Sequence, residues 1–152
     1  MTLNIDQGLQ SKAGFRGLRV AAKIVESSLI TSFHLEEADG SALPAFRPGQ
    51  FLVFKIPSGD PKGYVLRNYS LSGSPDDHCH YRISVKREPS AGPGLPVGQS
   101  SNYLHDNVCV GDVLIADGPR GEFVLDEVSD RPAVLFSGGV GLTPMVAMLH
   151  AL

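Results

Sequence analysis

Turn-forming residues divide this chain into short segments. Its 152 residues include 17 glycines and 11 prolines, more than a helical bundle tolerates. Between the turns, apolar and polar residues alternate, which is the pattern of β-strands with one buried face. Six short strands at such spacings indicate a mainly β fold in the form of a small closed barrel. We expect these strands over residues 18–26, 30–37, 50–56, 65–72, 81–86 and 113–116, and a short helix over 101–105.

The chain changes character after residue 130. A continuous apolar run over residues 133–137 has the pattern of a buried parallel strand, and residues 143–152 have the period of a helix. One strand and one helix cannot form a sheet. We therefore expect residues 15–130 to form the barrel and residues 131–152 to begin an incomplete second domain. Residues 1–14 are expected to be a lead-in or linker.

The turn between that last strand and helix has the sequence SGGVGLTP, residues 137–144. Its three glycines let the backbone turn sharply and approach a ligand closely. We expect Thr143 to cap the helix and Pro144 to occupy its first position, which aims free backbone N–H groups at an anion. A turn whose glycines serve only packing fits the same spacing equally well.

A second motif, Arg67-Asn68-Tyr69-Ser70, lies inside the fourth expected strand. Because side chains alternate along a strand, Arg67 and Tyr69 share a face and lie about 7 Å apart. A guanidinium can bind a phosphate through two donors, an aromatic ring can pack on a flat ligand, and Ser70 can bond to that ligand's edge. Taken alone, an ordinary barrel strand with an exposed arginine and a half-buried tyrosine is the simpler interpretation.

A third cluster, Gly98-Gln99-Ser100-Ser101-Asn102, opens the expected short helix. Backbone N–H groups and hydroxyls at the N-terminus of a helix can together bind an anion. Simple capping of the helix by Ser100 or Ser101 explains these serines equally well.

Charge and chain patterning exclude several classes of function. With 13 basic and 16 acidic residues, the formal net charge is -3, which provides no basic field for nucleic acid or for an anionic membrane. The sequence has no signal-peptide pattern and no apolar run long enough to span a membrane, so a cytoplasmic protein is expected. Cys79 and Cys109 are expected to be free thiols.

Metal-dependent and hydrolytic chemistry find no support in the residue pattern. His78-Cys79-His80 follows two aspartates, but ligands on alternating sides of a hairpin tip suit chelation poorly. We interpret this segment as a solvated loop and expect no metal site. His105 and His150 have no acid–base partner in the sequence.

The order of these motifs resembles that of the ferredoxin reductase superfamily of flavoproteins. The similarity runs from Phe15 to the C-terminus and is greatest to the reductase part of flavohaemoglobins. The stretches that carry it are FRPGQFLVF, RNYSLSG, YRISVKRE, SNYLHD, VGDVLIADGPRGEF and LFSGGVGLTPM. The resemblance implies a six-stranded antiparallel Greek-key barrel that binds FAD, followed by an α/β domain that binds NADH or NADPH. In that family, a hydride passes from the nicotinamide to flavin N5, and electrons then pass singly to a haem or iron-sulfur partner.

The resemblance also implies roles for individual residues. Arg67 would bind the FAD pyrophosphate, while Tyr69 would pack on the isoalloxazine and Ser70 would bond near N5 as the catalytic residues. The other FAD-contacting positions would be Phe51, Asn68, Val85, Lys86, Gly98, Ser100 and Ser101. The nicotinamide cofactor would lie on Gly138, Gly139, Val140, Gly141, Leu142 and Thr143.

Two positions depart from the family pattern. Phe51 stands where flavohaemoglobins often carry a tyrosine, so it offers FAD no hydroxyl, and the segment 89–96 is longer than the usual link. We expect the chain to be a fragment of a larger reductase whose hydride transfer needs the missing part. One alternative is a noncatalytic barrel that serves as a binding or regulatory module. Another is a reductase fused to a ferredoxin or to a molybdenum-cofactor domain.

Overall fold

The computed structural model describes residues 14–90, 92–93 and 98–152. The predicted lead-in over residues 1–14 therefore lies outside the described residues except for Gly14. The same holds for part of the segment 89–96, which has no predicted secondary structure.

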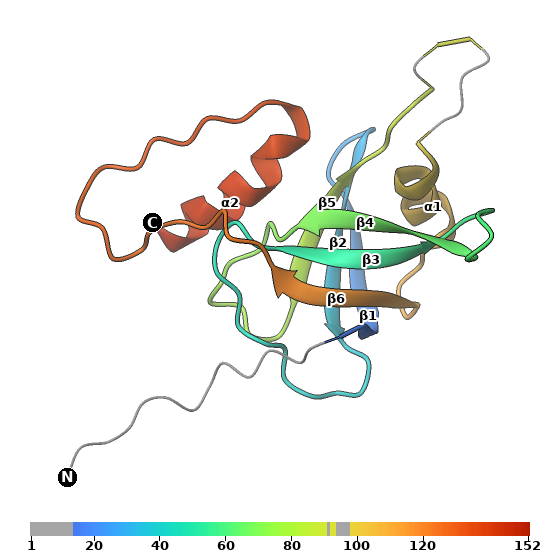
Figure 1. The fold of residues 1–152 in the computed structure, drawn as a ribbon, viewed down its shortest axis with the longest axis horizontal. Coiled ribbons are helices and arrows are strands. Elements are labelled where there is room, and N and C mark those ends of the chain that lie inside the picture. Colours follow the sequence, from blue (N-terminus) through green and yellow to red (C-terminus); the bar gives the residue numbers. More distant parts are fainter. Residues whose placement is uncertain (1–13, 91, 94–97) are drawn as a thin grey trace.

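Six strands form a single antiparallel sheet that closes on itself. They are β1 (Arg16–Val25), β2 (Ile30–Glu37), β3 (Phe51–Pro57), β4 (Tyr64–Ser70), β5 (Tyr81–Lys86) and β6 (Val113–Arg120). Their order is β4-β3-β6-β1-β2-β5, with every pair antiparallel. A bridge between Leu71 and Ile83 joins the chain at the end of β4 to β5, and Figure 1 shows the resulting barrel. The predicted six-stranded Greek-key barrel is confirmed.

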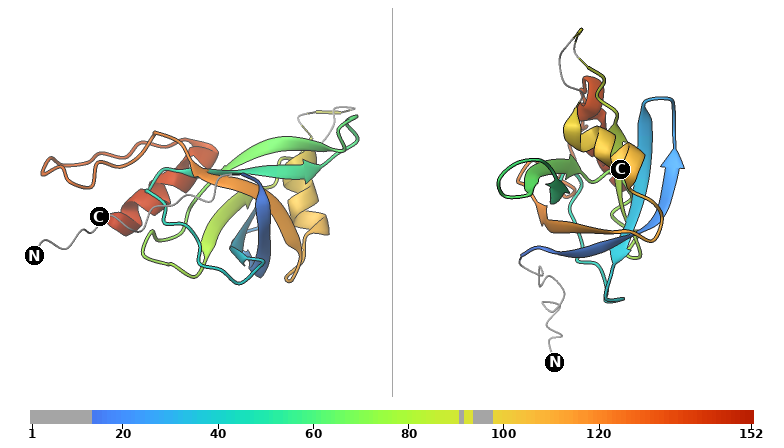
Figure 2. Two further views of the ribbon diagram at one scale, coloured as in Figure 1. Left: turned by 60° about the horizontal axis from the view of Figure 1, so that its bottom comes forward. Right: turned by 90° about the vertical axis from the view of Figure 1, so that its right-hand side faces the viewer.

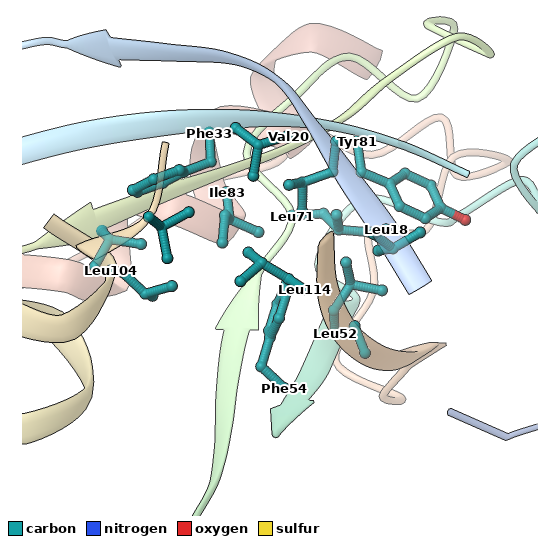
Figure 3. Packing of buried hydrophobic residues seen from close by; sticks show 14 of the residues in the cluster. Leu18, Val20, Phe33, Leu52, Phe54, Leu71, Tyr81, Ile83, Leu104 and Leu114 are labelled. Carbon is teal, nitrogen blue, oxygen red and sulfur yellow. The ribbon is translucent and has the colours of Figure 1, made fainter. Parts of the chain in front are cut away.

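Alternation along the strands fills the barrel with apolar side chains. Leu52 and Phe54 of β3 are fully buried, while the residues between and beside them are only partly buried. Ile83 and Tyr81 of β5 enter the same space from another strand. Figure 3 shows these side chains meeting in one cluster. Burial of apolar surface, at roughly 25 cal/mol per Å², is what favours the closed sheet over an open one.

Helix α1 (Gln99–Asn107) packs on the barrel through Leu104, which is fully buried. Lys23 of β1 donates hydrogen bonds of 2.7 Å to the carbonyl oxygens of His105 and Val108 at the C-terminal end of the helix. His105 Nε2 lies 2.9 Å from the carbonyl oxygen of Val85 in β5. Because a cation at this end also complements the helix dipole, these contacts hold α1 in a defined position beside β5.

The chain that follows β5 is tied to the first turn of α1. The backbone N–H of Glu88 donates to Ser101 Oγ at 3.1 Å. The Glu88 carbonyl accepts from Gly98 N at 3.1 Å and from Asn102 Nδ2 at 2.8 Å. These bonds place the N-terminus of α1 next to the end of β5.

Several predicted boundaries are wrong, and the last strand and the first helix differ most. The last strand continues to Arg120 instead of ending at residue 116, because the chain stays paired with β3 through Asp117 opposite Val53 and Arg120 opposite Phe51. The helix predicted over 101–105 is longer at both ends. Residues that are common in turns can thus belong to a strand or a helix when strand pairing or packing of a nearby apolar residue stabilises it.

The apolar run over residues 133–137 is not the predicted buried strand. It has no regular structure, and Val134 and Phe136 are 72% and 85% exposed. A strand needs a neighbour for its backbone hydrogen bonds, and within the described part of the chain no strand pairs with this run. Helix α2 (Leu142–Ala151) does form, and its Ala147 is buried in the main core cluster. Figures 1 and 2 show α1 and α2 at opposite ends of the strands.

The start of α2 also differs from the prediction. A 3-10 turn, η1 (Gly139–Gly141), leads directly into the helix, so Gly141 is its N-cap. Thr143 lies one residue inside the helix, and its hydroxyl donates back to the Val140 carbonyl at 2.9 Å. Pro144 therefore takes the third helical position instead of the first, which it tolerates because the first N–H groups of a helix have no intrahelical partner.

The loop before β5 is organised by Asp77. Its carboxylate accepts hydrogen bonds from the backbone N–H of Cys79 at 2.9 Å and of His80 at 3.0 Å. Cys79 and Cys109 are free and exposed. Among the described residues, no group of three or more His, Cys, Asp or Glu side chains is placed to hold a metal ion. None of the helices in that part of the chain is long and apolar enough to cross a membrane.

Candidate functional site

A cavity of about 470 Å³ lies over β4 and β5, between the N-terminus of α1 and the start of α2. It brings together residues from all three sequence motifs, although β5 lies between the first two motifs along the chain and β6 lies between the last two. Its lining consists of Arg67, Tyr69, Ser70, Ser84, Lys86, Glu88, Gly98, Gln99, Ser100, Ser101, Val140, Gly141, Thr143 and Pro144.

Strand β4 supplies a cation, an aromatic ring and a hydroxyl to this cavity. Arg67 and Tyr69 line it together, as the alternation of the strand predicts, and Ser70 follows at the end of the strand. The Tyr69 ring packs edge-on against Phe54 of the core, with ring centroids 5.8 Å apart. Burial raises the pKa of Tyr69 to about 12, and the charge of Arg67 opposes this shift. Tyr69 is therefore a neutral, fixed ring at ordinary pH.

The two cations of the cavity differ in how far their charge is compensated. Arg67 donates to the carbonyl oxygen of its neighbour Leu66 at 2.7 Å. Lys86 Nζ lies 3.5 Å from a carboxylate oxygen of Glu88, which lines the same cavity. Since no described carboxylate pairs with Arg67, its guanidinium is the more available partner for an anion.

The first turn of α1 presents an unsatisfied polar group. Its N-cap is Gly98, with no side-chain cap, which rules out capping by Ser100 or Ser101 as the explanation of these serines. Ser101 Oγ bonds to the backbone of Glu88 and Gly98. Ser100 Oγ is buried and has no hydrogen-bond partner among the described residues. A buried hydroxyl without a partner is costly, so Ser100 Oγ is available to bond to a ligand in this cavity.

The glycine-rich turn before α2 forms the opposite wall. Gly139 has a φ of +54°, and a Cβ built on Gly138, Gly139 or Gly141 would meet no heavy atom within 4 Å. The turn therefore leaves open space above its backbone. A second cavity of about 540 Å³ adjoins the first and is lined by Gly139 and Leu142, among others. The two cavities share Ser84, Lys86, Val140 and Thr143.

Four of the predicted positions line neither cavity. Phe51 packs against the Gly121 backbone instead, Asn68 is exposed on β4, and Val85 is buried in the core with its carbonyl bonded to His105. Gly138 comes immediately before the lining residue Gly139 but is not part of either lining. The predicted cofactor contacts did not include Ser84, Glu88, Gln99 and Pro144, although Gln99 and Pro144 belong to the motifs described above and the outward position of Ser84 follows from the alternation along β5.

The lining fits a long ligand that has a phosphate group at one place and a flat ring at another. Arg67, the α1 N-terminus and Ser100 are donors for phosphate oxygens. Tyr69 offers an apolar ring face, with Ser70 beside it as a hydrogen-bonding group.

Comparisons with known proteins agree on one relationship. Residues 17–125 match the family model described as the oxidoreductase FAD-binding domain. A flavohemoprotein of Chromobacterium violaceum is 51% identical over 140 residues, which is 92% of this chain and 34% of that protein. A flavohemoprotein of Deinococcus radiodurans is 51% identical over 138 residues, or 91% of this chain and 32% of that protein. The chain thus spans about a third of the length of these relatives.

Solved structures show the same fold. The flavohem-like FAD/NAD binding domain of nitric oxide dioxygenase from Vibrio cholerae matches 89% of this chain and 55% of its own, with a TM-score of 0.78 and 42% identity. Phthalate dioxygenase reductase matches 90% of this chain and 39% of its own, with a TM-score of 0.70 and 31% identity.

Proposed function

The chain belongs to the family of oxidoreductase FAD-binding domains, of the flavohaemoglobin-like reductase type, and we propose that its cavity over β4 and β5 is the FAD site. The observation that carries this proposal is the buried, unpartnered hydroxyl of Ser100 at the N-terminus of α1. It lies in one cavity with Arg67 and Tyr69. FAD has both the phosphates and the flat ring that this lining suits.

Each part of the cavity has a distinct binding role. Arg67 and Ser100 donate to the pyrophosphate, together with the free N–H groups of the first turn of α1. Tyr69 holds the ring system by packing, and Ser70 bonds to its polar edge beside N5. Lys86 adds a second positive charge close to the end of β5.

The relatives also support a proposal for the wider reaction. Bound FAD would accept a hydride from NADH or NADPH and pass electrons on singly. The turn from Gly138 to Thr143 would hold the nicotinamide cofactor, and residues 131–152 would begin its domain, after a barrel domain of residues 15–130. The electron acceptor would be a haem or iron-sulfur group. This is supported by the flavohemoprotein relatives and by phthalate dioxygenase reductase, whose structure is described as transferring electrons from pyridine nucleotides to [2Fe-2S]. A cytoplasmic location is supported by the two free, exposed cysteines.

Ser100 allows a test that separates binding from folding. In the Ser100→Ala variant, the free protein loses an unsatisfied buried hydroxyl, so its free energy of unfolding should stay constant or rise. Its affinity for FAD should fall about 10- to 150-fold, since a hydrogen bond to a charged group contributes roughly 1.5–3 kcal/mol. Isothermal titration with FAD and urea unfolding measure the two quantities.

Ser101→Ala is the contrasting variant for the stability measurement. It removes a hydroxyl that already bonds to Glu88 and Gly98, so it should destabilise the free protein. An FAD affinity that Ser100→Ala leaves unchanged would remove the main support for the proposal. A wild-type chain that binds no FAD would favour a noncatalytic barrel.

A further inference from the structure

Two serines face each other where the barrel closes. The antiparallel bridge pairs Leu71 with Ile83, and both of these side chains are fully buried. The position before Leu71 therefore lies opposite the position after Ile83, and both side chains point away from the core. These positions are Ser70 and Ser84, and both line the cavity assigned to FAD. Figure 1 shows β4 and β5 side by side at this point.

Ser84 is part of a chain of hydroxyl groups behind the cavity. Its Oγ lies 2.9 Å from Ser72 Oγ and 2.9 Å from Ser32 Oγ. Ser72 and Ser32 are each only 1% exposed. Arg82 holds the far end of the chain, because its Nε donates to Ser72 Oγ at 3.2 Å and its Nη2 donates to the Ser72 carbonyl at 2.6 Å.

Arg82 sets the direction of the hydrogen bonds, since a guanidinium can only donate. Ser72 accepts from Arg82 and must pass its own proton on. The Ser72 proton has two acceptors within reach, the Arg82 carbonyl at 3.3 Å and Ser84 Oγ at 2.9 Å. The carbonyl already accepts from the Ser72 backbone N–H at 2.8 Å, so the shorter contact to Ser84 is the better one. Ser84 then accepts from Ser72 and has its own proton to donate.

Ser32 allows Ser84 to direct that proton toward a ligand without losing the hydrogen bond between the two serines. Ser32 can receive the proton of Ser84, or it can rotate and donate to Ser84. In the second arrangement Ser84 accepts two hydrogen bonds, and its proton points into the cavity. Hydrogen bonds in such a chain strengthen one another, and this chain starts at the cation Arg82. Ser84 is therefore a stronger donor than an isolated serine.

We infer that Ser84 is a second hydroxyl contact to the flavin ring, opposite Ser70, and that it donates to an acceptor atom on the polar edge of that ring. The inference rests on the proposed FAD site. It adds a ring contact from β5 to the ring contact from β4, so that both strands bond to the polar edge of the flavin where β4 meets β5. Ser72 and Arg82 are positioning residues, because they act through Ser84.

The test uses the whole 152-residue chain with FAD and with riboflavin, which has the ring but no phosphate. Ser84→Ala should weaken both ligands by a similar factor, about two- to thirteenfold, the range for one hydrogen bond. At saturating FAD, the visible absorption bands of the bound flavin should shift, because the ring loses a donor. Ser84→Thr keeps a hydroxyl on the strand and should restore both the affinity and the bands.

Two matched variants separate this contact from general effects on the fold. Thr31→Val removes a buried hydroxyl of β2 that bonds to His105 and lines neither cavity, so it should leave the bands of bound FAD in place. Arg67→Ala should weaken FAD but not riboflavin. If the bands of FAD bound to Ser84→Ala superimpose on those of the wild type, the contact does not exist, whatever the affinity. If the wild-type chain binds neither ligand, the proposed function fails together with the inference.

Discussion

Replacing Arg67 tests the phosphate-binding half of the site. Its guanidinium has no carboxylate partner among the described residues, whereas Lys86 is partly compensated by Glu88 at 3.5 Å. Arg67 therefore provides the larger uncompensated charge in the cavity. A charge-assisted hydrogen bond contributes roughly 1.5–3 kcal/mol, which corresponds to about 10- to 150-fold in affinity. Because Arg67 lies on an exposed part of β4, we expect Arg67→Ala to weaken FAD binding by an amount in the lower part of that range, just above tenfold.

The assay is a titration of FAD followed by quenching of flavin fluorescence, at low and at high salt. The ratio of the wild-type and variant affinities should shrink as salt screens the charge. Arg67→Lys should give an intermediate affinity, because it keeps the charge but loses the planar fork. Arg19→Ala is the control, since Arg19 lies on β1 outside the cavity and pairs with Glu36 at 3.5 Å. Equal affinities of the wild type and Arg67→Ala for FAD at low salt would refute the assignment.

Two further predictions concern stability. Glu37→Gln should lower the free energy of unfolding by about 3 kcal/mol in urea denaturation, because Glu37 is 3% exposed and its loss leaves the Arg16 side chain, only 11% exposed, without its carboxylate. The exposed Glu36→Gln should change it by less than about 0.5 kcal/mol. The pKa of Tyr69 is about 12 in the folded protein against 10.0 as the ordinary value, so the unfolded chain releases this proton at a lower pH than the folded protein. The free energy of unfolding should therefore keep this contribution below about pH 10 and lose it as the pH rises to about 12. Tyr69→Phe should remove that part of the decline, and an unchanged pH profile in this variant would contradict the burial of the ring.

The barrel was predictable because its strands are locally consistent. Alternation and turn residues give β2 and β5 their observed bounds, and the same alternation places Arg67 and Tyr69 on one wall. The bend into α2 was recognisable from its glycines. These features depend on residues that are close together in the sequence, so the alternation of apolar and polar residues and the turn residues predict them.

Other features depend on contacts that the sequence pattern does not contain. Residues 133–137 have the composition of a strand, but a strand exists only where another strand pairs with it. The site contains Ser84 because β5 meets the end of β4 there, and it contains Glu88 because its backbone bonds to the first turn of α1. Phe51, in contrast, begins a strand next to the site and yet packs on Gly121. Contacts between residues far apart in the sequence, which no local motif specifies, decide each of these outcomes.

The central claim is that the cavity over β4 and β5 holds FAD. Its most direct test is the visible absorbance of the protein peak in gel filtration, after the purified chain has been mixed with excess FAD. We expect the flavin bands to elute with the protein at about one FAD per chain. A protein peak that is folded by circular dichroism but carries no flavin absorbance would contradict the account.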